Sequence, residues 1–334
     1  MAVRKPSMQM IADRLGVSKV SVSKVLNNQD GISAELRRQV LQVAEELGYI
    51  NSRQTVTETY RLAFLVPKHY FFLENERFYT TIYYYFNREC ISRQFPLSLF
   101  VISKNEEDQL ILQPSLTKDN FDGLIITGEM NEAYLKALMD LRIPAITVDF
   151  YKQHLVTDCI LTDNFYISYS ATNHLIDMGH KDIGFVGNPK WTSSVMDRFF
   201  GYQKALMAAD LPYRSEWNIS NNDPMGGYTS DIPLPEVLPT AFVCHCDMAA
   251  YYLIKTLKNR RLNIPGDISV ISFDNTELSQ NSEPSLTTVN IDKHEFARKA
   301  LEKIILRAQD PHKPAERIFV SSQLVHRDSV RRLL

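Results

Sequence analysis

The chain has 334 residues, of which 44% are hydrophobic and 23% are charged, and its formal net charge is -2. This length exceeds what one hydrophobic core usually supports and favours about two domains, while the ordinary globular composition excludes a fibrous or disordered protein. The charge is uneven, because residues 1–53 carry eight Lys and Arg against five Asp and Glu, which makes this segment +3 and the remainder -5. A basic segment on an acidic body favours a polyanionic partner for that segment.

Membrane and secretion signals are not found in the sequence. No apolar stretch approaches ~18 residues, and the start lacks the apolar core of a secretory signal. The four cysteines are too few and too scattered for a disulfide framework. We therefore expect a cytoplasmic protein with reduced thiols and no membrane partner.

Three short helices are predicted over residues 1–50. Ser7 can cap a first helix that Gly16 ends, and Ser18 can cap a second helix. A third helix is expected to begin at Ser33 and to keep a 3.6-residue apolar period until Gly48. Tight turns join these helices, so the segment is predicted to form a helix-turn-helix.

The second of these helices predicts a DNA-reading surface. Val22, Val25 and Leu26 form its inward stripe, so its cations and hydroxyls must face elsewhere. Such side chains suit guanine edges and phosphates, and a small apolar group suits a thymine methyl. A three-helix unit can also be a protein-docking module, but this polar surface favours DNA. The candidate DNA-binding residues are Ser18, Lys19, Val20, Ser21, Ser23, Lys24 and Asn27.

Residues 51–60 are polar and Thr-rich and are predicted to be a linker. From Arg61 onward, apolar runs alternate with helical segments, which is typical of parallel sheets covered by helices. Strands are predicted at 62–66, 97–102, 123–127, 145–148, 183–187, 241–244 and 269–273, and helices at 77–94, 106–116 and 131–141. The repeat of the pattern predicts that residues 61–334 form two lobes, approximately 61–160 with 290–320 and 161–289 with 321–334. Ligands bind such sheets at the carboxyl ends of strands, so a cleft is expected between the lobes.

Several motifs together resemble one known family. GVSKVSVSKVLNN and ISAELRRQVLQVAEELGY in the first fifty residues resemble the head of the lactose repressor/galactose repressor family. Six further motifs follow in the family's order: DNF, LIDMGHKDIGFVGN, DRFFGYQKAL, IPGDISVISFDN, PSLTTV and LVHRDS. The resemblance implies an all-α helix-turn-helix head and an α/β two-lobed, periplasmic-binding-protein-like effector domain. It also implies a homodimeric regulator of double-stranded operator DNA.

Two positions depart from the family pattern. Members usually carry a proline and a hinge helix after the head, whereas Ile50-Asn51 stands there in this chain. We assign Arg53 and Val56 to the hinge, and Val56 is its only candidate for insertion into the minor groove. The second departure is Cys246-Asp247, where the family typically has Asn-Asp.

The resemblance assigns Arg198, Asp247 and Asp274 to effector binding. Both aspartates also follow predicted strands directly, so they should lie at the strand ends that face the cleft. Carboxylates and a guanidinium can hydrogen-bond the vicinal hydroxyls of a sugar. The alternative is that Asp274 caps a turn and that Arg198 lies on the surface.

Aromatic and acidic residues after strands of the first lobe are candidates for the opposite wall, where aromatic rings could stack on a sugar. Burial in the core or in an interface is an equally good interpretation for each of these residues. The candidates are Tyr70, Phe71, Phe72, Glu129 and Tyr151, and Trp191 is added from the second lobe.

No metal, cofactor or catalytic residue is expected. Cys244 and Cys246 share one face of a strand while His245 points away, and no second Cys pair is present to complete a zinc site. The sequence contains no phosphate-binding loop, nucleophile elbow or HExxH motif.

We therefore predict a sequence-specific repressor, not an enzyme, whose operator affinity is controlled by a small effector, and we favour a sugar. One alternative is a global catabolite-type member of the same family, controlled by a phosphorylated partner protein. Another is a cytosolic sugar-binding module or sugar-processing enzyme, neither of which needs the head. Because no heptad repeat follows Arg331, a dimer is expected rather than a tetramer.

Overall fold

The computed structural model divides the chain into two compact units, Met1–Thr59 and Tyr60–Leu334, called here the head and the body. The residues that it describes are 6–26, 32–47, 59–71, 77–221 and 228–333.

The head contains three helices, α1 (Met8–Leu15), α2 (Lys19–Leu26) and α3 (Ala34–Glu46). The predicted caps of the first two are confirmed. The Ser7 hydroxyl accepts a hydrogen bond from the Met10 N–H, the Ser18 hydroxyl accepts one from Ser21 (3.0 Å), and Gly16 ends α1 with a φ of 64°. The apolar stripes meet in a small core made of Ile11, Ala12, Val22, Val25, Leu26, Val40, Val43 and Ala44. The predicted helix end at Gly48 lies outside the described residues.

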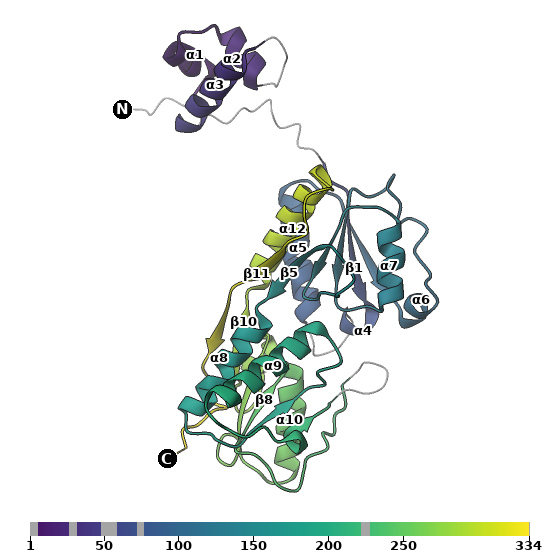
Figure 1. Ribbon diagram of the computed structural model, residues 1–334, viewed down its shortest axis with the longest axis vertical. Coiled ribbons are helices and arrows are strands. Elements are labelled where there is room, and N and C mark those ends of the chain that lie inside the picture. Colours follow the sequence, from purple (N-terminus) through teal and green to yellow (C-terminus); the bar gives the residue numbers. More distant parts are fainter. Residues whose placement is uncertain (1–5, 27–31, 48–58, 72–76, 222–227, 334) are drawn as a thin grey trace. The chain divides into compact units, whose positions relative to one another are not determined.

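The body contains two six-stranded sheets (Figure 1). The first sheet is parallel throughout, in the order β11-β5-β4-β3-β1-β2. Its strands are β1 (Leu62–Pro67), β2 (Leu97–Ile102), β3 (Gly123–Thr127), β4 (Ala145–Val148), β5 (Asp158–Thr162) and β11 (Arg317–Val320). Its helices are α4 (Lys68–Phe71), α5 (Phe78–Ser92), α6 (Lys104–Asp108), α7 (Glu132–Asp140) and α12 (Lys293–Gln309). These elements form the first lobe.

The second sheet has the order β12-β10-β9-β8-β6-β7, and only β12 runs antiparallel to its neighbour. Its strands are β6 (Ile183–Val186), β7 (Asn218–Ile219), β8 (Ala241–Cys244), β9 (Ser269–Phe273), β10 (Thr287–Ile291) and β12 (Ser322–Val325). Its helices are α8 (Asn164–Asp177), α9 (Ser193–Ala208), the 3-10 helix Ser215–Trp217, α10 (Asp247–Asn259) and α11 (Glu277–Asn281). These elements form the second lobe.

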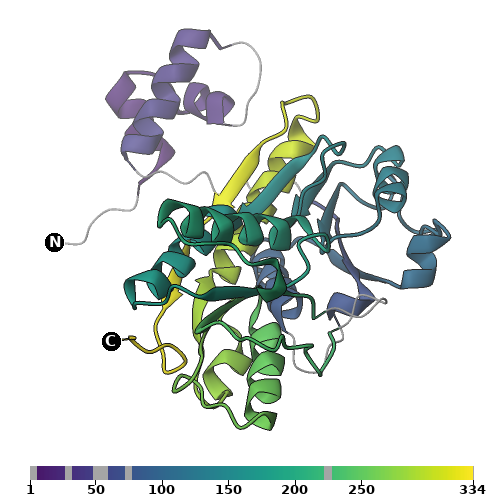
Figure 2. The same ribbon diagram turned by 60° about the horizontal axis from the view of Figure 1, so that its bottom comes forward.

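The chain passes between the lobes three times, after β5, after β10 and between β11 and β12. Figure 2 shows the last of these segments, in yellow, running from one lobe to the other.

Alternation along β1 explains why helices cover both faces of the first sheet. Leu62, Phe64 and Val66 belong to the cluster that includes side chains of α5 and α12, whereas Ala63 and Leu65 belong to the cluster with α7. All five side chains are fully buried, as expected for a central parallel strand.

The predicted helix at 106–116 is wrong in its extent. A capping box of Ser103 and Glu106 starts α6 at Lys104, and the helix ends at Asp108. Leu110 has a φ of 55°, which a continuing helix cannot contain. The apolar residues that suggested a longer helix belong to a loop instead.

Close approach of α8 and α9 requires Gly201. A Cβ at this position would lie 2.2 Å from the carbonyl oxygen of Phe165 on α8. The Ser168 hydroxyl of α8 donates to the Arg198 carbonyl (2.6 Å), and the Tyr202 hydroxyl donates to the Ile183 carbonyl (2.7 Å). These contacts fix α9, and therefore the position of Arg198, against the second sheet.

Across the described residues, no helix is long and apolar enough to cross a membrane.

Candidate functional site

A cavity of about 70 Å³ lies between the two lobes. Its walls include groups that directly follow strands: Asp149 after β4, His245 after β8 and Asp274 after β9. Six aromatic side chains from both lobes line it, namely Tyr70, Phe78, Tyr79, Trp191, Tyr228 and His245. The Trp191 ring lies 5.5 Å from the Tyr228 ring and 6.1 Å from the Tyr70 ring, so the two lobes share one aromatic wall. Such a concave, largely apolar space with a few polar groups is typical of a small-molecule site.

Arg198 holds the polar groups of the second lobe together. It is 4% exposed, and its Nε donates to Asn164 Oδ1 (2.8 Å). Its Nη1 donates to the His245 carbonyl and its Nη2 to Asp274 Oδ1 (3.4 Å). The guanidinium also lies 4.7 Å from the Phe273 ring centroid. All three nitrogens are therefore engaged by the lobe that carries them.

Asp149 faces the same cavity from the first lobe and has a different environment. Its Oδ2 accepts a hydrogen bond from the Tyr79 hydroxyl (2.8 Å), while its buried Oδ1 has no hydrogen-bond partner among the described residues. Burial raises the pKa of Asp149 to about 7, although Arg198 and Tyr79 act in the opposite direction. Asp149 was not among the predicted effector-binding residues, although it follows a predicted strand directly.

Asp274 adopts a backbone conformation that is rare for its residue type, with a φ of 101°. Lys293 donates to its backbone carbonyl, and Arg198 approaches its carboxylate. Burial raises the pKa of Asp274, and the two cations oppose this effect. A strained, buried residue held by several neighbours is a common feature of binding sites.

Asp247 does not line the cavity. Its Oδ1 accepts hydrogen bonds from Ser272 (2.6 Å) and Thr288 (2.7 Å), and its Oδ2 accepts two from Thr276 (2.7 and 2.9 Å). The carboxylate therefore secures the turn that carries Asp274. Next to it, Cys246 lines the cavity, and its Sγ accepts from the Ala249 N–H at the start of α10 (3.4 Å).

Glu129 and Tyr151 connect the lobes instead of lining the cavity. Glu129 Oε2 accepts hydrogen bonds from the Ser193 N–H (2.7 Å) and hydroxyl (3.2 Å), and its Oε1 contacts Lys152. The Tyr151 N–H donates to the Ser193 hydroxyl (3.2 Å), and the Tyr151 hydroxyl donates to Asp197 (2.9 Å). We call this set of contacts the interlobe latch. It joins loops of the first lobe to the first turns of α9.

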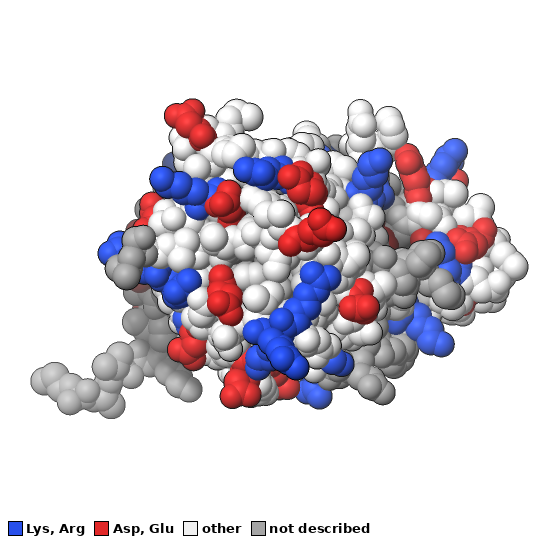
Figure 3. All heavy atoms as spheres, turned by 90° about the horizontal axis from the view of Figure 1, so that it is seen from below, with Lys and Arg blue, Asp and Glu red and all other residues white. Residues whose placement is uncertain are grey.

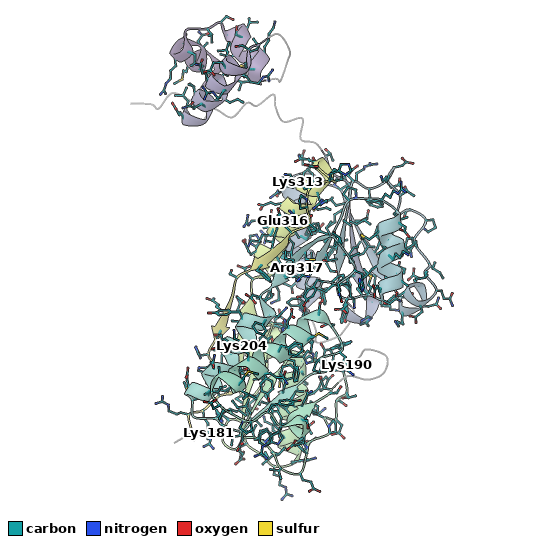
Figure 4. All side chains as sticks on the ribbon, viewed as in Figure 1. Lys181, Lys190, Lys204, Lys313, Glu316 and Arg317 are labelled. Carbon is teal, nitrogen blue, oxygen red and sulfur yellow. The ribbon has the colours of Figure 1, made fainter. Side chains whose placement is uncertain are left out.

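Of the remaining residues predicted to bind the effector, some line the cavity and others do not. Tyr70 and Trp191 line the cavity, whereas Phe71 is buried in the core and packs against Tyr83. The Tyr151 ring lies under Arg317, whose guanidinium is 4.3 Å from the ring centroid and which is labelled in Figure 4. Phe72 lies outside the described residues. Cavity-lining groups that the sequence analysis missed include Phe78, Tyr79, Ser194, Tyr228 and His245.

In the head, the predicted DNA-reading side chains of α2 lie at the surface. Val20 is 65% exposed, and Lys19, Lys24 and Ser18 are exposed. Ser21 and Ser23 are half-buried. Three further candidates, Asn27, Arg53 and Val56, lie outside the described residues.

Charge is mixed on the face of the molecule that Figure 3 shows. Among the described side chains there, Lys and Arg alternate with Asp and Glu, and neither sign gathers into a patch.

Comparisons with known proteins match both units. Residues 7–52 match the bacterial regulatory proteins of the lacI family, and residues 172–330 match the periplasmic binding protein-like domain. The HTH-type transcriptional repressor PurR of Histophilus somni (strain 2336) is 30% identical over 333 residues, covering 97% of this chain and 98% of that protein. The chain belongs to the lacI family of bacterial regulatory proteins. It is therefore a DNA-binding transcriptional repressor under effector control, with a helix-turn-helix head and a periplasmic-binding-protein-like body.

Solved structures of the family share this fold. The transcriptional regulator CelR in its cellobiose complex has a TM-score of 0.70 at 22% identity, covering 97% of this chain and 99% of that chain. The Lac repressor dimer bound to operator and an anti-inducer has a TM-score of 0.65 at 20% identity, covering 98% and 100%.

Proposed function

We propose that this lacI-family repressor acts in the cytoplasm as a homodimer on a pseudo-palindromic operator, and that a sugar bound between the lobes alters its operator affinity. The observation that carries the proposal is the cavity in which Asp149, Arg198 and Asp274 converge inside aromatic walls. Carboxylates accept hydrogen bonds from sugar hydroxyls, and aromatic faces pack on the apolar face of a sugar ring. The similar CelR structure holds cellobiose, which supports a carbohydrate of this general kind.

Binding is coupled to DNA through the arrangement of the lobes. The cavity takes side chains from both lobes, so a ligand there contacts both and favours the arrangement in which they are close. The interlobe latch adds contacts in that same arrangement. A ligand can change the operator affinity only to the extent that it binds one arrangement of the lobes more tightly than the other. Operator binding must then change the affinity for the ligand by the same factor.

In the head, we propose that α2 enters the major groove. Lys19, Val20 and Lys24 are the exposed base-reading candidates, and Ser18, Ser21 and Ser23 supply hydroxyls for phosphates. Asn27 remains a predicted DNA contact and Arg53 and Val56 remain predicted hinge residues.

The test is a selection of duplexes by the full chain from a random library, followed by fluorescence anisotropy on the selected operator. We expect affinity to fall steeply with salt, because each phosphate contact releases counterions. A flat response between low and physiological salt would overturn the assignment of the head to DNA.

The same assay, repeated with saturating sugars from a panel, tests the body. At least one sugar is expected to change the operator affinity. If no sugar changes it, the assignment of the cleft to a carbohydrate is wrong.

A further inference from the structure

We infer that the effector carries a positively charged nitrogen, as an amino sugar does, and places this nitrogen at Asp149. The inference rests on the proposed function of the cleft and narrows the chemistry of its ligand.

One oxygen of the Asp149 carboxyl group has no hydrogen-bond partner among the described residues. The residue is 7% exposed, and its Oδ1 is buried without a hydrogen-bond partner among the described residues, although the same carboxyl lines the cavity. Leaving a buried acceptor unsatisfied is unfavourable, so the site is built to receive a donor from a ligand.

The charged groups that line the cavity also favour a cationic ligand. Its described lining holds two carboxyl groups, Asp149 and Asp274, and one cation, Arg198, whose nitrogens are all engaged within its own lobe. The nearby Lys293 ammonium donates to the Asp274 and Ile291 carbonyls. Burial lowers the pKa of His245 to about 3, so this ring adds no charge at neutral pH. Among the groups that line the cavity, the charge is therefore net negative when both carboxyls are ionised, while the Lys293 charge acts on Asp274 from outside the lining.

Two segments of the body that the structure does not describe cannot reverse this balance. Residues 72–76 and 222–227 contain no Lys, Arg or His in the sequence. A phosphorylated or carboxylate effector would thus find no spare cation in the described cavity, and each ionised carboxyl group there would repel it.

The aromatic wall of the cavity favours a cation as well. Tyr70, Tyr79, Trp191 and Tyr228 line the same cavity as Asp149, and the Tyr79 ring lies 5.3 Å from the Tyr70 ring. Aromatic faces attract cations, and this attraction strengthens when the cation is removed from water. Carboxylate and rings together therefore favour an ammonium group over a hydroxyl, which would satisfy Oδ1 but leave the negative charge uncompensated.

The test is calorimetric titration of the full chain with matched probes: D-glucosamine against D-glucose, and D-galactosamine against D-galactose. We expect at least one amino sugar to bind about tenfold or more tightly than its neutral parent, which corresponds to ~1.4 kcal/mol. The N-acetyl derivative keeps an N–H but loses the charge, so it should bind no more tightly than the neutral parent. Equal or stronger binding of the neutral sugars, or no binding of any amino sugar, would overturn the inference.

Asp149→Asn tests the position of the nitrogen. Its amide oxygen still accepts a hydrogen bond, but the charge is gone, so the preference for the amino sugar over its parent should disappear. Asp177→Asn, at an exposed position on α8, is the matched control and should keep the preference. If Asp149→Asn still prefers the amino sugar over its neutral parent, the nitrogen binds elsewhere and the inference is overturned.

The inference and the proposed function fail in distinguishable ways. Neutral sugars that alter operator binding while amino sugars do not would contradict the inference alone. Operator binding that no sugar of either kind alters would contradict the proposed function of the cleft.

Discussion

Folding takes the carboxyl group of Asp149 out of water and supplies only Tyr79 as a hydrogen-bond partner within the described residues. Such a group is unfavourable for stability unless a ligand completes its environment. A buried carboxyl group of this kind beside Arg198 and Asp274 is consistent with a binding function, because proteins commonly give up stability at functional sites.

Asp149→Asn is expected to stabilise the body at alkaline pH. Because the pKa of Asp149 is about 7 in the folded chain and ordinarily 3.8, the folded state binds the proton more tightly, and stability falls as pH rises through this window. The substitution removes that loss, so the melting temperature at pH 8 should rise by roughly 5 °C. At pH 4 the difference should be much smaller. His245, whose pKa is lowered by burial, destabilises both proteins equally as pH falls below 6.5. An equal difference at both pH values would show that ionisation of Asp149 is not its cause.

Lys19→Ala is expected to change which operator the head prefers. The residue lies exposed at the start of α2, where recognition helices contact base edges. If it reads a base, the loss should be about 1–3 kcal/mol on the selected operator and much smaller on operators altered at the contacted base pair. Anisotropy with a set of single-base variants measures this. The control is Lys181→Ala, an exposed position in the body that Figure 4 labels. An equal loss on every duplex would make Lys19 a phosphate contact.

At the scale of elements, the interlobe latch depends on one loop carboxylate meeting the first turn of α9. Glu129→Ala removes the acceptor for both Ser193 donors, and hydrogen bonds to charged groups contribute about 1.5–3 kcal/mol each. Since the latch joins the lobes when they are close, effector affinity should fall by about tenfold or more. Calorimetry on the identified effector measures this. Glu132→Ala, exposed in the first turn of α7, should leave it unchanged. If the effector affinity of Glu129→Ala is unaltered, the interlobe latch does not contribute to effector binding.

Most central strands of the body's two sheets could be predicted, because they are buried on both faces and appear in the sequence as continuous apolar runs, such as Leu62–Pro67. The strands β5, β7, β10, β11 and β12 were missed. Of these, β7, β11 and β12 lie at sheet edges, where exposed residues such as Arg317 and Gln323 interrupt the apolar pattern of the last two, whereas β5 and β10 are central strands that contain polar residues such as Asp158 and Asn290. The loop after Asp108 was mistaken for helix because its apolar residues happen to recur at helical spacing.

The cleft could be predicted only in part, from the rule that ligands bind at the carboxyl ends of parallel strands. This rule predicted that Asp274 faces the cleft, and Asp274 lines the cavity. The rule also selected Tyr151, whereas Asp149, two residues earlier, lines the cavity. Asp247 was misplaced because its partners Thr276 and Thr288 are distant in sequence, and nothing local shows that they satisfy it. Side-chain direction at a strand end depends on such long-range contacts.

At the scale of the whole molecule, effector binding in the cleft is expected to change the operator affinity of the head. Asp274→Ala is expected to fold and to bind operator, but to show no change of affinity with effector, because the altered cleft no longer distinguishes ligand-bound from free arrangements. Operator binding with and without saturating effector, together with a melting curve, tests this. A folded variant that responds at the wild-type effector concentration would remove Asp274 from the site.

Dimerisation is expected to involve the outer face of α5. Tyr84 and Ile91 are 55% and 66% exposed and lie seven residues apart, on one side of the helix. Ile91→Glu should therefore shift the protein toward a monomer in light scattering and weaken operator binding, because a dimer binds two half-sites at once. The matched control is Met207→Glu on α9, which is 77% exposed and should remain dimeric. A dimer that persists in Ile91→Glu would move the interface to another surface.

The three passages of the chain between the lobes also set an order for synthesis. Each sheet takes an edge strand from the last part of the chain, β11 for the first and β12 for the second. Chains emerge from the ribosome starting with the N-terminus, so neither lobe is complete until residues 317–325 have been made. The head has no such dependence, since its buried core lies between Ile11 and Ala44. A premature stop before residue 317 would thus leave a chain with an intact head and two sheets with unpaired edges, prone to aggregate instead of sensing.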